Sequence, residues 1–205
     1  MEEAKEKIKE LMMDLSIFKN EEIDNLFKLG SVFVIIQNEY IEEEMGGIFS
    51  FVNVSFPKHL QNTILYLLSE LTDNITQHSE FKKGIIFLNY DYIKKETVMT
   101  VFDDGISIPG GFKRNRISFG DDSEAIKMAL KGKSTKDEKG RGFGLSTSQR
   151  LVEKGFSGEF LIVSGKGFYD SRNLNLISKK EVKGTLLSIR FFDKGEDLNI
   201  YPYIA

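Results

Sequence analysis

Apolar residues recur at two different spacings along the chain, and the change of spacing predicts where helices and strands fall. A spacing of three to four residues, typical of helices, occurs at residues 3–29, 58–77, 123–130 and 145–154. Short apolar or alternating runs between turn residues predict strands at residues 32–36, 49–54, 85–92, 97–102, 160–164 and 185–192, with one more segment near 174–177. Strands interspersed with a few helices favour an α+β or α/β two-layer sandwich.

The segment 60–78 carries the clearest helical pattern in the chain. On a helical wheel, its apolar stripe consists of Ile64, Leu68, Leu71 and Ile75. A second stripe is polar, flanks the first, and consists of Glu70, Asn74 and His78 at intervals of four residues. Flanking positions of this kind are where side chains line the rim of a pocket over the core.

Glu70 and Asn74 are a chemically useful pair. A carboxylate can orient or deprotonate an attacking nucleophile. An amide carbonyl is a hard oxygen ligand that suits Mg²⁺, whose other ligands are usually waters and nucleotide phosphates. Taken alone, the pair is explained more simply as ordinary polar residues on a half-exposed helix face.

A second candidate is the acidic turn that follows the strand at 97–102, where Asp103 and Gly105 end an apolar run. A carboxylate at a strand end can accept a hydrogen bond from an amine, such as that of adenine. A glycine lets the backbone come close to a flat ring. Because Asp-Gly is also a common turn dipeptide, this motif is weak by itself.

The third candidate is the glycine-rich loop before the helix at 145–154. Gly140, Gly142 and Gly144 stand at alternate positions, which frees backbone N–H groups to face anionic oxygens, and the following helix adds its dipole. The loop has no full Walker A match. A Rossmann site fails because the glycines come late and no strand stands directly before them. The pattern therefore favours a phosphate site of another kind.

Composition and charge narrow the classes of function. The chain has 205 residues, a net charge of −3 and no cysteine, so disulfides and thiolate metal sites are excluded. Residues 1–44 hold 12 acidic residues against five lysines, whereas residues 113–141 hold nine bases against five acids. An acidic chain with one short basic segment argues for a small phosphate ligand over duplex DNA. On charge alone, a solvated lysine-rich loop explains that segment more simply.

The chain offers no membrane or export signal. Its longest aliphatic runs are far shorter than a membrane span of about 20 residues. The first residues are charged and unlike a signal peptide. A cytoplasmic location without a membrane is therefore expected.

Taken in order, four motifs resemble one known family. They are Glu70-x-x-x-Asn74 on a helix, Asp103-x-Gly105 after a strand, Gly140-x-Gly142-x-Gly144 before a helix, and Gly184-Thr185 on the last strand. Their order resembles the N, G1, G2 and G3 boxes of the GHKL, or Bergerat-fold, ATPase superfamily over about residues 55–192. The stretch 70–79 looks closest to anti-sigma serine kinases and stand-alone, histidine-kinase-like ATP-binding domains. The resemblance implies an α+β sandwich whose mixed, mostly antiparallel sheet carries helices on one face.

The resemblance also implies a role for each matching residue, with ATP and Mg²⁺ as cofactors. Glu70 would be the general base or would position it, and Asn74 would bind Mg²⁺. Asp103 would recognise the adenine amine, supported by Thr185, and Gly105 would give the base room. The lid over the phosphates would consist of Ser134, Thr135, Gly140, Arg141, Gly142, Phe143, Gly144 and Leu145.

Two departures from the family pattern matter. Ser107 stands where the usual DxGxG motif has its second glycine. After the last motif, no lysine clearly matches the one that gyrase-like members place on the γ-phosphate, and Lys194 is the remaining candidate. The first departure weakens the match to the G1 box, and the second leans against the clamp branch.

The expected function is that of a Mg·ATP-binding domain that hydrolyses ATP or transfers its γ-phosphate to a regulatory partner protein. The alternatives are an ATP-gated interaction module without turnover and, less favoured, an ATP-driven dimeric clamp. Because residues 1–55 contain no histidine, we expect that the chain is not a self-sufficient histidine kinase, although it could still be a partner-dependent one.

The expected organisation has three parts: an acidic extension (1–48), the ATP-binding domain (49–195) and a short tail (196–205). The best-supported boundary is the one near residue 48, after the acidic run and Gly46-Gly47. The extension could pair two subunits as a homodimer or pack against its own sheet, through the apolar residues Ile8, Leu11, Met12 and Leu15.

Overall fold

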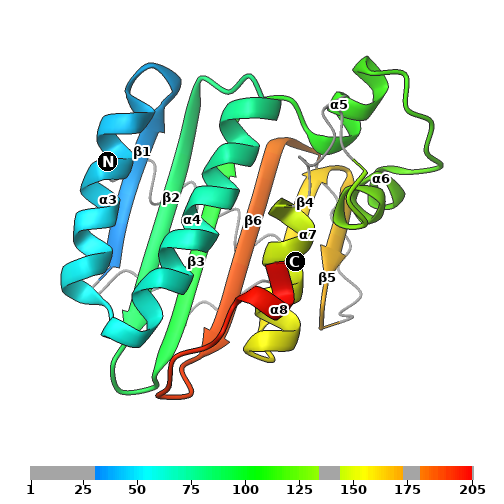
Figure 1. Cartoon of the computed structure of the whole chain (residues 1–205). Helices are drawn as coiled ribbons and strands as arrows, with labels where there is room; N and C mark the ends of the chain where they lie inside the picture. The colour runs from blue at the N-terminus through cyan, green and yellow to red at the C-terminus, as the bar shows by residue number, and fades with distance from the viewer. Residues whose placement is uncertain (1–30, 134–143, 173–180, 205) are drawn as a thin grey trace.

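A six-stranded sheet with helices packed on one of its faces forms the described part of the chain (Figure 1). The computed structural model describes residues 31–133, 144–172 and 181–204. The strands are β1 (Ser31–Gln37), β2 (Lys83–Asp91), β3 (Glu96–Asp103), β4 (Glu159–Gly165), β5 (Gly167–Asp170) and β6 (Val182–Phe192). The helices are α3 (Ile41–Ser55), α4 (Lys58–His78), α5 (Ile108–Arg114), α6 (Asp122–Leu130), α7 (Gly144–Arg150) and α8 (Tyr201–Ile204), with the 3-10 helix η1 (Asn38–Tyr40) and the π-helical turn η2 (Leu151–Gly155). The expected α+β sandwich is confirmed.

The strand order is β1-β2-β3-β6-β4-β5, and every pairing among the described strands is antiparallel. The register sets Asp103 of β3 opposite Thr185 of β6, and Thr185 opposite Ser164 of β4. Three polar side chains that are far apart in sequence therefore meet at one end of the sheet.

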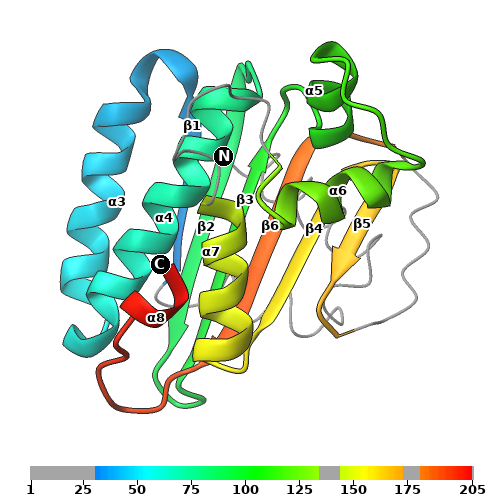
Figure 2. The ribbon, with the colours of Figure 1, turned by 45° about the vertical axis from the view of Figure 1, so that its right-hand side comes forward.

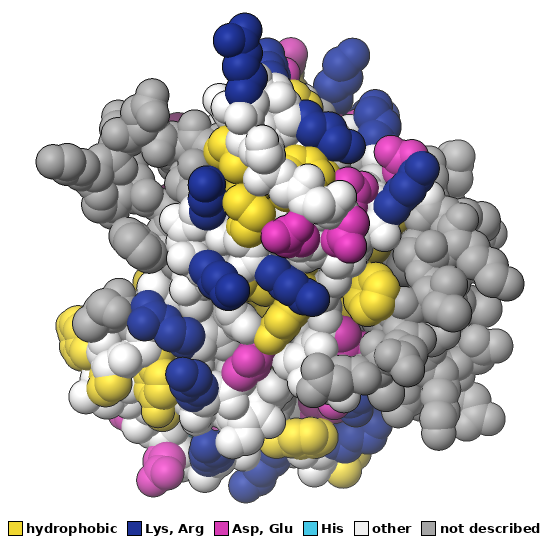
Figure 3. Space-filling model, turned by 90° about the vertical axis from the view of Figure 1, so that its right-hand side faces the viewer, with side chains coloured by type: hydrophobic (Ala, Val, Ile, Leu, Met, Phe, Trp, Pro, Cys, Tyr) yellow, Lys and Arg dark blue, Asp and Glu magenta, His cyan; other side chains and the backbone are white. Residues whose placement is uncertain are grey.

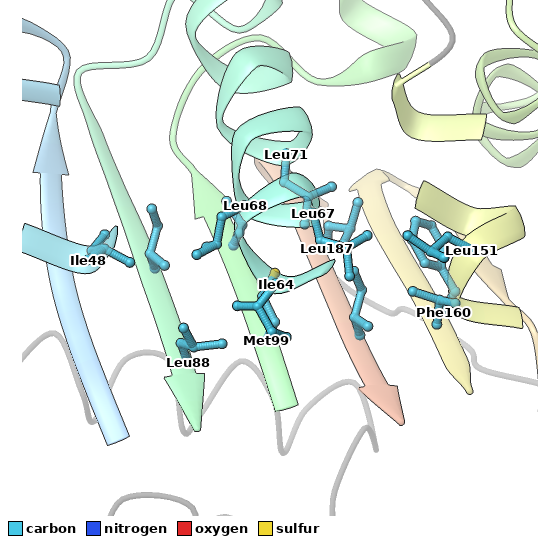
Figure 4. Close-up of a cluster of buried hydrophobic side chains, with 14 of the residues drawn as sticks. Ile48, Ile64, Leu67, Leu68, Leu71, Leu88, Met99, Leu151, Phe160 and Leu187 are labelled. Carbon is cyan, nitrogen blue, oxygen red and sulfur yellow. The ribbon is translucent and has the colours of Figure 1, made fainter. Parts of the chain in front are cut away.

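Helix α4 packs along the centre of the sheet and is the main contributor to the core between the two layers. Its predicted apolar stripe is buried: Ile64 and Leu68 are 0% exposed, Leu71 is 2% exposed and Ile75 is 5% exposed. Figure 4 shows Ile64, Leu68 and Leu71 against the side chains of the strands, with Met99 and Leu187 beneath them. Because this face points into the core, Glu70 and Asn74 stand half-buried at its edge, as the helical wheel predicts.

The predicted strand at 49–54 is wrong, because these residues belong to α3. Met45, Ile48 and Val52 are buried at helical spacing, whereas Val54 is 86% exposed. The run of β-forming residues suggested a strand. Packing against the sheet instead buries positions i, i+3 and i+7, which lie on one face of a helix.

The predicted boundary near residue 48 falls inside α3, where Ile48 is buried in the core. Strand β1 pairs with β2 along its whole length and belongs to the same sheet. Within the described residues, the chain shows no break at this position. The expectations for residues 1–30 lie outside the described residues.

The remaining elements agree with the sequence pattern except at three places. The β2–β3 hairpin, α6, β4 and β6 stand where they were predicted, and the predicted helix at 145–154 is α7 followed by η2. Helix α5, strand β5 and helix α8 were not predicted. The segment near 174–177 lies outside the described residues. Figure 2 shows α4 and α7 side by side on the sheet, with α8 against α7.

Within the described ranges, no helix combines the length and the apolar character that crossing a membrane requires.

Candidate functional site

A cavity of about 380 Å³ opens between α4, the β3–α5 turn, α5 and the ends of α6 and α7. Leu71 and Ile75 of α4 and Val101 and Leu187 of the sheet give it an apolar wall. Its volume is in the range of sites for small ligands. Four of the predicted site residues line it: Asn74, Asp103, Leu145 and Thr185.

The other predicted site residues fall into two groups. Glu70, Gly105 and Gly144 are described but are not among the residues that line the cavity. Each is close in sequence to a residue that lines the cavity. Gly105 precedes Ile106, Gly144 precedes Leu145, and Glu70 lies one helical turn before Asn74. Ser134, Thr135, Gly140, Arg141, Gly142 and Phe143 lie outside the described residues.

Asp103 is the buried acid of the cavity, at 2% exposed. Burial raises its pKa to about 6, although hydrogen bonds from the Gly105 N–H, the Ser79 side chain and the Thr185 N–H act in the opposite direction. The Gly105 bond to Oδ1 measures 2.9 Å. These donors hold the carboxylate in place and keep it mainly ionised at neutral pH, so it can accept a hydrogen bond from a ligand amine.

Thr185 is held beside Asp103 by Ser164, which was not predicted. The Ser164 and Thr185 hydroxyls are 2.8 Å apart, and Ser164 Oγ donates to the Gly184 carbonyl at 3.1 Å. Because Ser164 has one proton and gives it to Gly184, Thr185 donates to Ser164 and keeps its lone pairs for the cavity. A serine at the end of the apolar run 160–163 was the available sequence signal.

Two glycines let the elements around Asp103 approach one another. A Cβ on Gly184, whose φ is +87°, would lie 1.9 Å from the Asp103 carbonyl oxygen. A Cβ on Gly105 would lie 2.1 Å from the Ser79 carbonyl oxygen, which accepts the Ile106 N–H at 2.5 Å. The close contact of Gly105 is therefore with the end of α4, and its predicted role of making room for a base stays a prediction.

Asn74 faces the same cavity from α4. Its Nδ2 is buried and has no hydrogen-bond partner among the described residues. Leaving a buried amide donor unsatisfied costs about 1–3 kcal/mol, so such groups usually have a ligand, water or protein partner. An amide with a spare donor fits an anionic oxygen, and its Oδ1 remains available to a hard cation such as Mg²⁺.

Glu70 lies against the first turn of α7. A Cβ built on Gly144 would come within 2.0 Å of Glu70 Oε2, so the carboxylate contacts the bare backbone of that glycine. Burial and the charge of Asp73 raise the pKa of Glu70, while a hydrogen bond from Tyr66 lowers it. A half-buried carboxylate with a raised pKa is typical of a group that handles protons.

The basic residues around the cavity have different surroundings. Lys133 and Arg114 line it, and Arg114 also pairs with Glu80 at 2.5 Å, where both side chains are largely exposed. Lys194 does not line the cavity, because its Nζ donates to the Gly155 carbonyl at 2.8 Å. On the face shown in Figure 3, Lys and Arg side chains are interspersed with Asp and Glu.

The sandwich and its cavity, with a buried acid and a threonine facing an amide-bearing helix, define a nucleotide-binding domain of the Bergerat type. The family model described as Histidine kinase-, DNA gyrase B-, and HSP90-like ATPase matches residues 59–194, and the chain belongs to this family. It is thus an ATP-binding domain of the GHKL type. A comparison with curated proteins found no match.

Proposed function

We propose that the chain binds Mg·ATP in this cavity and either hydrolyses the nucleotide or transfers its γ-phosphate to a partner protein in regulation. The observation that carries the proposal is that Asp103 of β3 and Asn74 of α4 line one cavity. The family binds ATP, usually with Mg²⁺. Both fit this cavity, which has Asp103 at the end formed by the sheet and Asn74 at the end formed by α4.

At the sheet end, the adenine amine would donate to the Asp103 carboxylate. The apolar wall formed by Leu71, Ile75 and Leu187 suits the faces of a flat base. Thr185, fixed by Ser164, would complete the set of polar groups that read the base edge.

At the helix end, Asn74 Oδ1 would hold Mg²⁺ together with the phosphates, and the ion would neutralise phosphate charge when bound. Asn74 Nδ2 would then have a phosphate oxygen as its partner. Glu70, one turn earlier, would accept the proton of the attacking water or of the partner's hydroxyl. Both reactions use the same groups, so the site supports hydrolysis and phosphotransfer alike.

A second candidate is an ATP-gated interaction module with little turnover. The observation that favours it is the position of Glu70, which contacts Gly144 and does not line the cavity. A dimeric clamp is less well supported, because Lys194 bonds to Gly155 and the basic residues are mixed with acidic ones on the face in Figure 3. We propose a cytoplasmic location, where ATP is available.

Calorimetric titration of ATP with and without Mg²⁺ tests the proposal. Asp103→Asn should weaken ATP binding at least 100-fold, since the carboxylate is replaced by a group that can donate. Asn74→Ala should remove the Mg²⁺ dependence. Asp197→Asn and Asn53→Ala, which change exposed residues outside the cavity lining, are the matched controls. Wild-type protein that binds no nucleotide would refute the proposal. If it does bind, measuring γ-phosphate release or transfer separates an enzyme that turns ATP over from an ATP-gated interaction module.

A further inference from the structure

The rim of the cavity carries an ion pair that joins the ends of two helices. Glu80 stands two residues after the end of α4, and Arg114 is the last residue of α5. The Arg114 Nη1 group donates to Glu80 Oε1 at 2.5 Å, and both residues line the cavity. The Glu80 side chain is 64% exposed and that of Arg114 is 59% exposed, so the pair lies where the cavity meets solvent.

The position of Glu80 is unfavourable for the fold. Its φ is 49°, in the left-handed region, where the residue that follows a helix is usually glycine. A carboxylate at this place also lies at the negative end of the dipole of α4, where a basic side chain would be stabilising. Among the described non-glycine residues with positive φ, Glu80 is the one that lines the cavity. The stability of the helix therefore does not explain this glutamate.

The ion pair does not explain it as a structural residue either. An exposed ion pair between two flexible side chains usually contributes little to stability. The backbone already joins the end of α4 to the turn before α5, because the Ile106 N–H donates to the Ser79 carbonyl at 2.5 Å. A residue that breaks the local rules of helix ends, at the rim of a binding cavity, points to a role in binding.

Arg114 is suited to an anionic ligand. Arg114 and Lys133 are the basic residues among the described ones that line the cavity. A guanidinium has five N–H donors in a planar fork that matches phosphate oxygens, and the bond to Glu80 uses a donor on Nη1. A carboxylate and a phosphate are both anionic oxygen acceptors for such donors. Glu80 and a bound polyphosphate therefore compete for Arg114.

We propose that Arg114 binds the phosphates of the ligand and that Glu80 occupies Arg114 while the cavity is empty. Binding is then an exchange of anions, in which a phosphate oxygen replaces the Glu80 carboxylate. Glu80 weakens the binding of phosphates, because its own bond to Arg114 has to break first. That the phosphates belong to a nucleotide rests on the proposed function. The exchange itself rests on the ion pair and its place at the rim.

The experiment is calorimetric titration of the full chain with Mg·ATP, with tripolyphosphate in the absence of Mg²⁺, and with adenosine. Arg114→Gln should weaken the binding of both phosphate ligands about tenfold, and Glu80→Gln should tighten it about fivefold at low salt and less at high salt. Adenosine, which has no phosphate, should bind both variants as it binds wild type. Glu181→Gln is the matched control, because it removes the same charge from an exposed pair with Lys166, at 3.8 Å, outside the cavity lining.

The double variant tests the exchange directly. If Glu80 acts through Arg114, Glu80→Gln should no longer tighten binding in the Arg114→Gln background. A gain that persists undiminished there would mean that Glu80 repels the ligand without an exchange, and a gain no larger than that of Glu181→Gln would mean that the site is not involved. Either result overturns the proposal. The urea midpoint of Glu80→Gln should equal or exceed that of wild type, and a clear fall would assign the pair to the fold and overturn the proposal as well.

The three ligands separate this proposal from the proposed function. If tripolyphosphate follows the expected pattern and adenosine does not bind, the exchange stands and the proposed recognition of the base fails. If ATP binds in a Mg²⁺-dependent way but Arg114→Gln and Glu80→Gln behave like Glu181→Gln, the proposed binding of ATP stands and the exchange fails. Wild-type protein that binds neither ATP nor tripolyphosphate overturns both.

Discussion

The two ends of the cavity are built differently. At the sheet end, Asp103 accepts a hydrogen bond from the Gly105 N–H, and Thr185 is tied to Ser164. At the helix end, the buried Asn74 Nδ2 has no partner among the described residues, and the pKa of Glu70 is raised by burial.

On the proposed function, this difference separates recognition of the base from reaction at the phosphates. An acceptor that its neighbours hold in place before any ligand arrives would reduce the entropy lost when a base binds. The helix end keeps polar groups whose hydrogen bonding is incomplete within the described residues, and these are the groups that a phosphate and a cation would satisfy. The comparison predicts that changes at the sheet end cost stability, whereas changes at the helix end cost function.

The largest expected effect on stability is that of Gly184→Ala. A Cβ at this position would lie 1.9 Å from the Asp103 carbonyl, and the φ of +87° is unfavourable for alanine. Because the clash is with backbone, we expect a loss of about 3 kcal/mol or more in urea unfolding, together with loss of ATP binding.

Gly144→Ala provides the contrast from the helix end. Its Cβ would meet Glu70 Oε2 at 2.0 Å, but that atom is the end of a flexible side chain that can rotate away. Stability should therefore change by less than about 1 kcal/mol, while turnover falls because Glu70 is displaced. Gly46→Ala, with nothing within 4 Å in the middle of α3, is the control and should stabilise by about 0.5–1 kcal/mol. Equal losses of stability for Gly184→Ala and Gly144→Ala would contradict the predicted difference between the two ends of the cavity.

The next effect is the pH dependence that Asp103 gives to the sheet end. Its pKa is about 6 in the folded chain against an ordinary 3.8. Between about pH 4 and pH 6, the unfolded chain has released a proton that the folded chain still holds. Stability should therefore fall as the pH rises through this window, by about 3 kcal/mol in total.

Ligand binding should respond to pH in the opposite direction. On the proposed function, the ionised Asp103 carboxylate accepts the hydrogen bond of the adenine amine more strongly than the protonated carboxyl does, so affinity should fall by up to about tenfold per pH unit below about pH 6. Adenosine is the probe, since it has no phosphate that titrates. Asp103→Asn should flatten the stability profile between pH 4 and pH 6. Adenosine binding that is equally tight at pH 5 and pH 7 would argue against a role of this carboxylate in base recognition.

The sequence predicted long periodic elements well and failed where tertiary contacts decide. Helix α4 has one clear period, the β2–β3 hairpin consists of two runs of β-forming residues around a charged turn, and both were placed correctly. The segment 49–54 has strong β-forming residues, and only its burial against the sheet shows that α3 continues through it. Helix α5 was missed because Ile108-Pro109-Gly110-Gly111 resembles a loop, although Pro109 stands in the first turn and Ser107 caps it.

The candidate site was predictable to the extent that its motifs are local. Asn74, Asp103, Leu145 and Thr185 were expected together and line one cavity. The partners of these residues were not predictable, because they depend on register and packing. Ser164 meets Thr185 only through the antiparallel register of β4 and β6.

The smallest expected effect concerns Asn74 in the absence of nucleotide. Asn74→Leu keeps a similar volume and removes a buried donor that has no partner in the described structure. Leucine also has the higher helix propensity. The nucleotide-free protein should therefore gain up to about 1 kcal/mol in urea unfolding, although the Mg²⁺-dependent binding of ATP is lost.

Asn53→Leu on the exposed face of α3 is the control, since it reports the gain from helix propensity alone. The matching change at the sheet end is Ser164→Ala, which leaves the Ile108 N–H and the Thr185 hydroxyl without their partner. That variant should lose about 1–3 kcal/mol. A stable Asn74→Leu beside a weakened Ser164→Ala would mean that polar groups serve folding at one end of the cavity and ligand binding at the other. If Asn74→Leu instead loses as much as Ser164→Ala, the amide is part of the fold, and the case for it as a phosphate and Mg²⁺ ligand is lost.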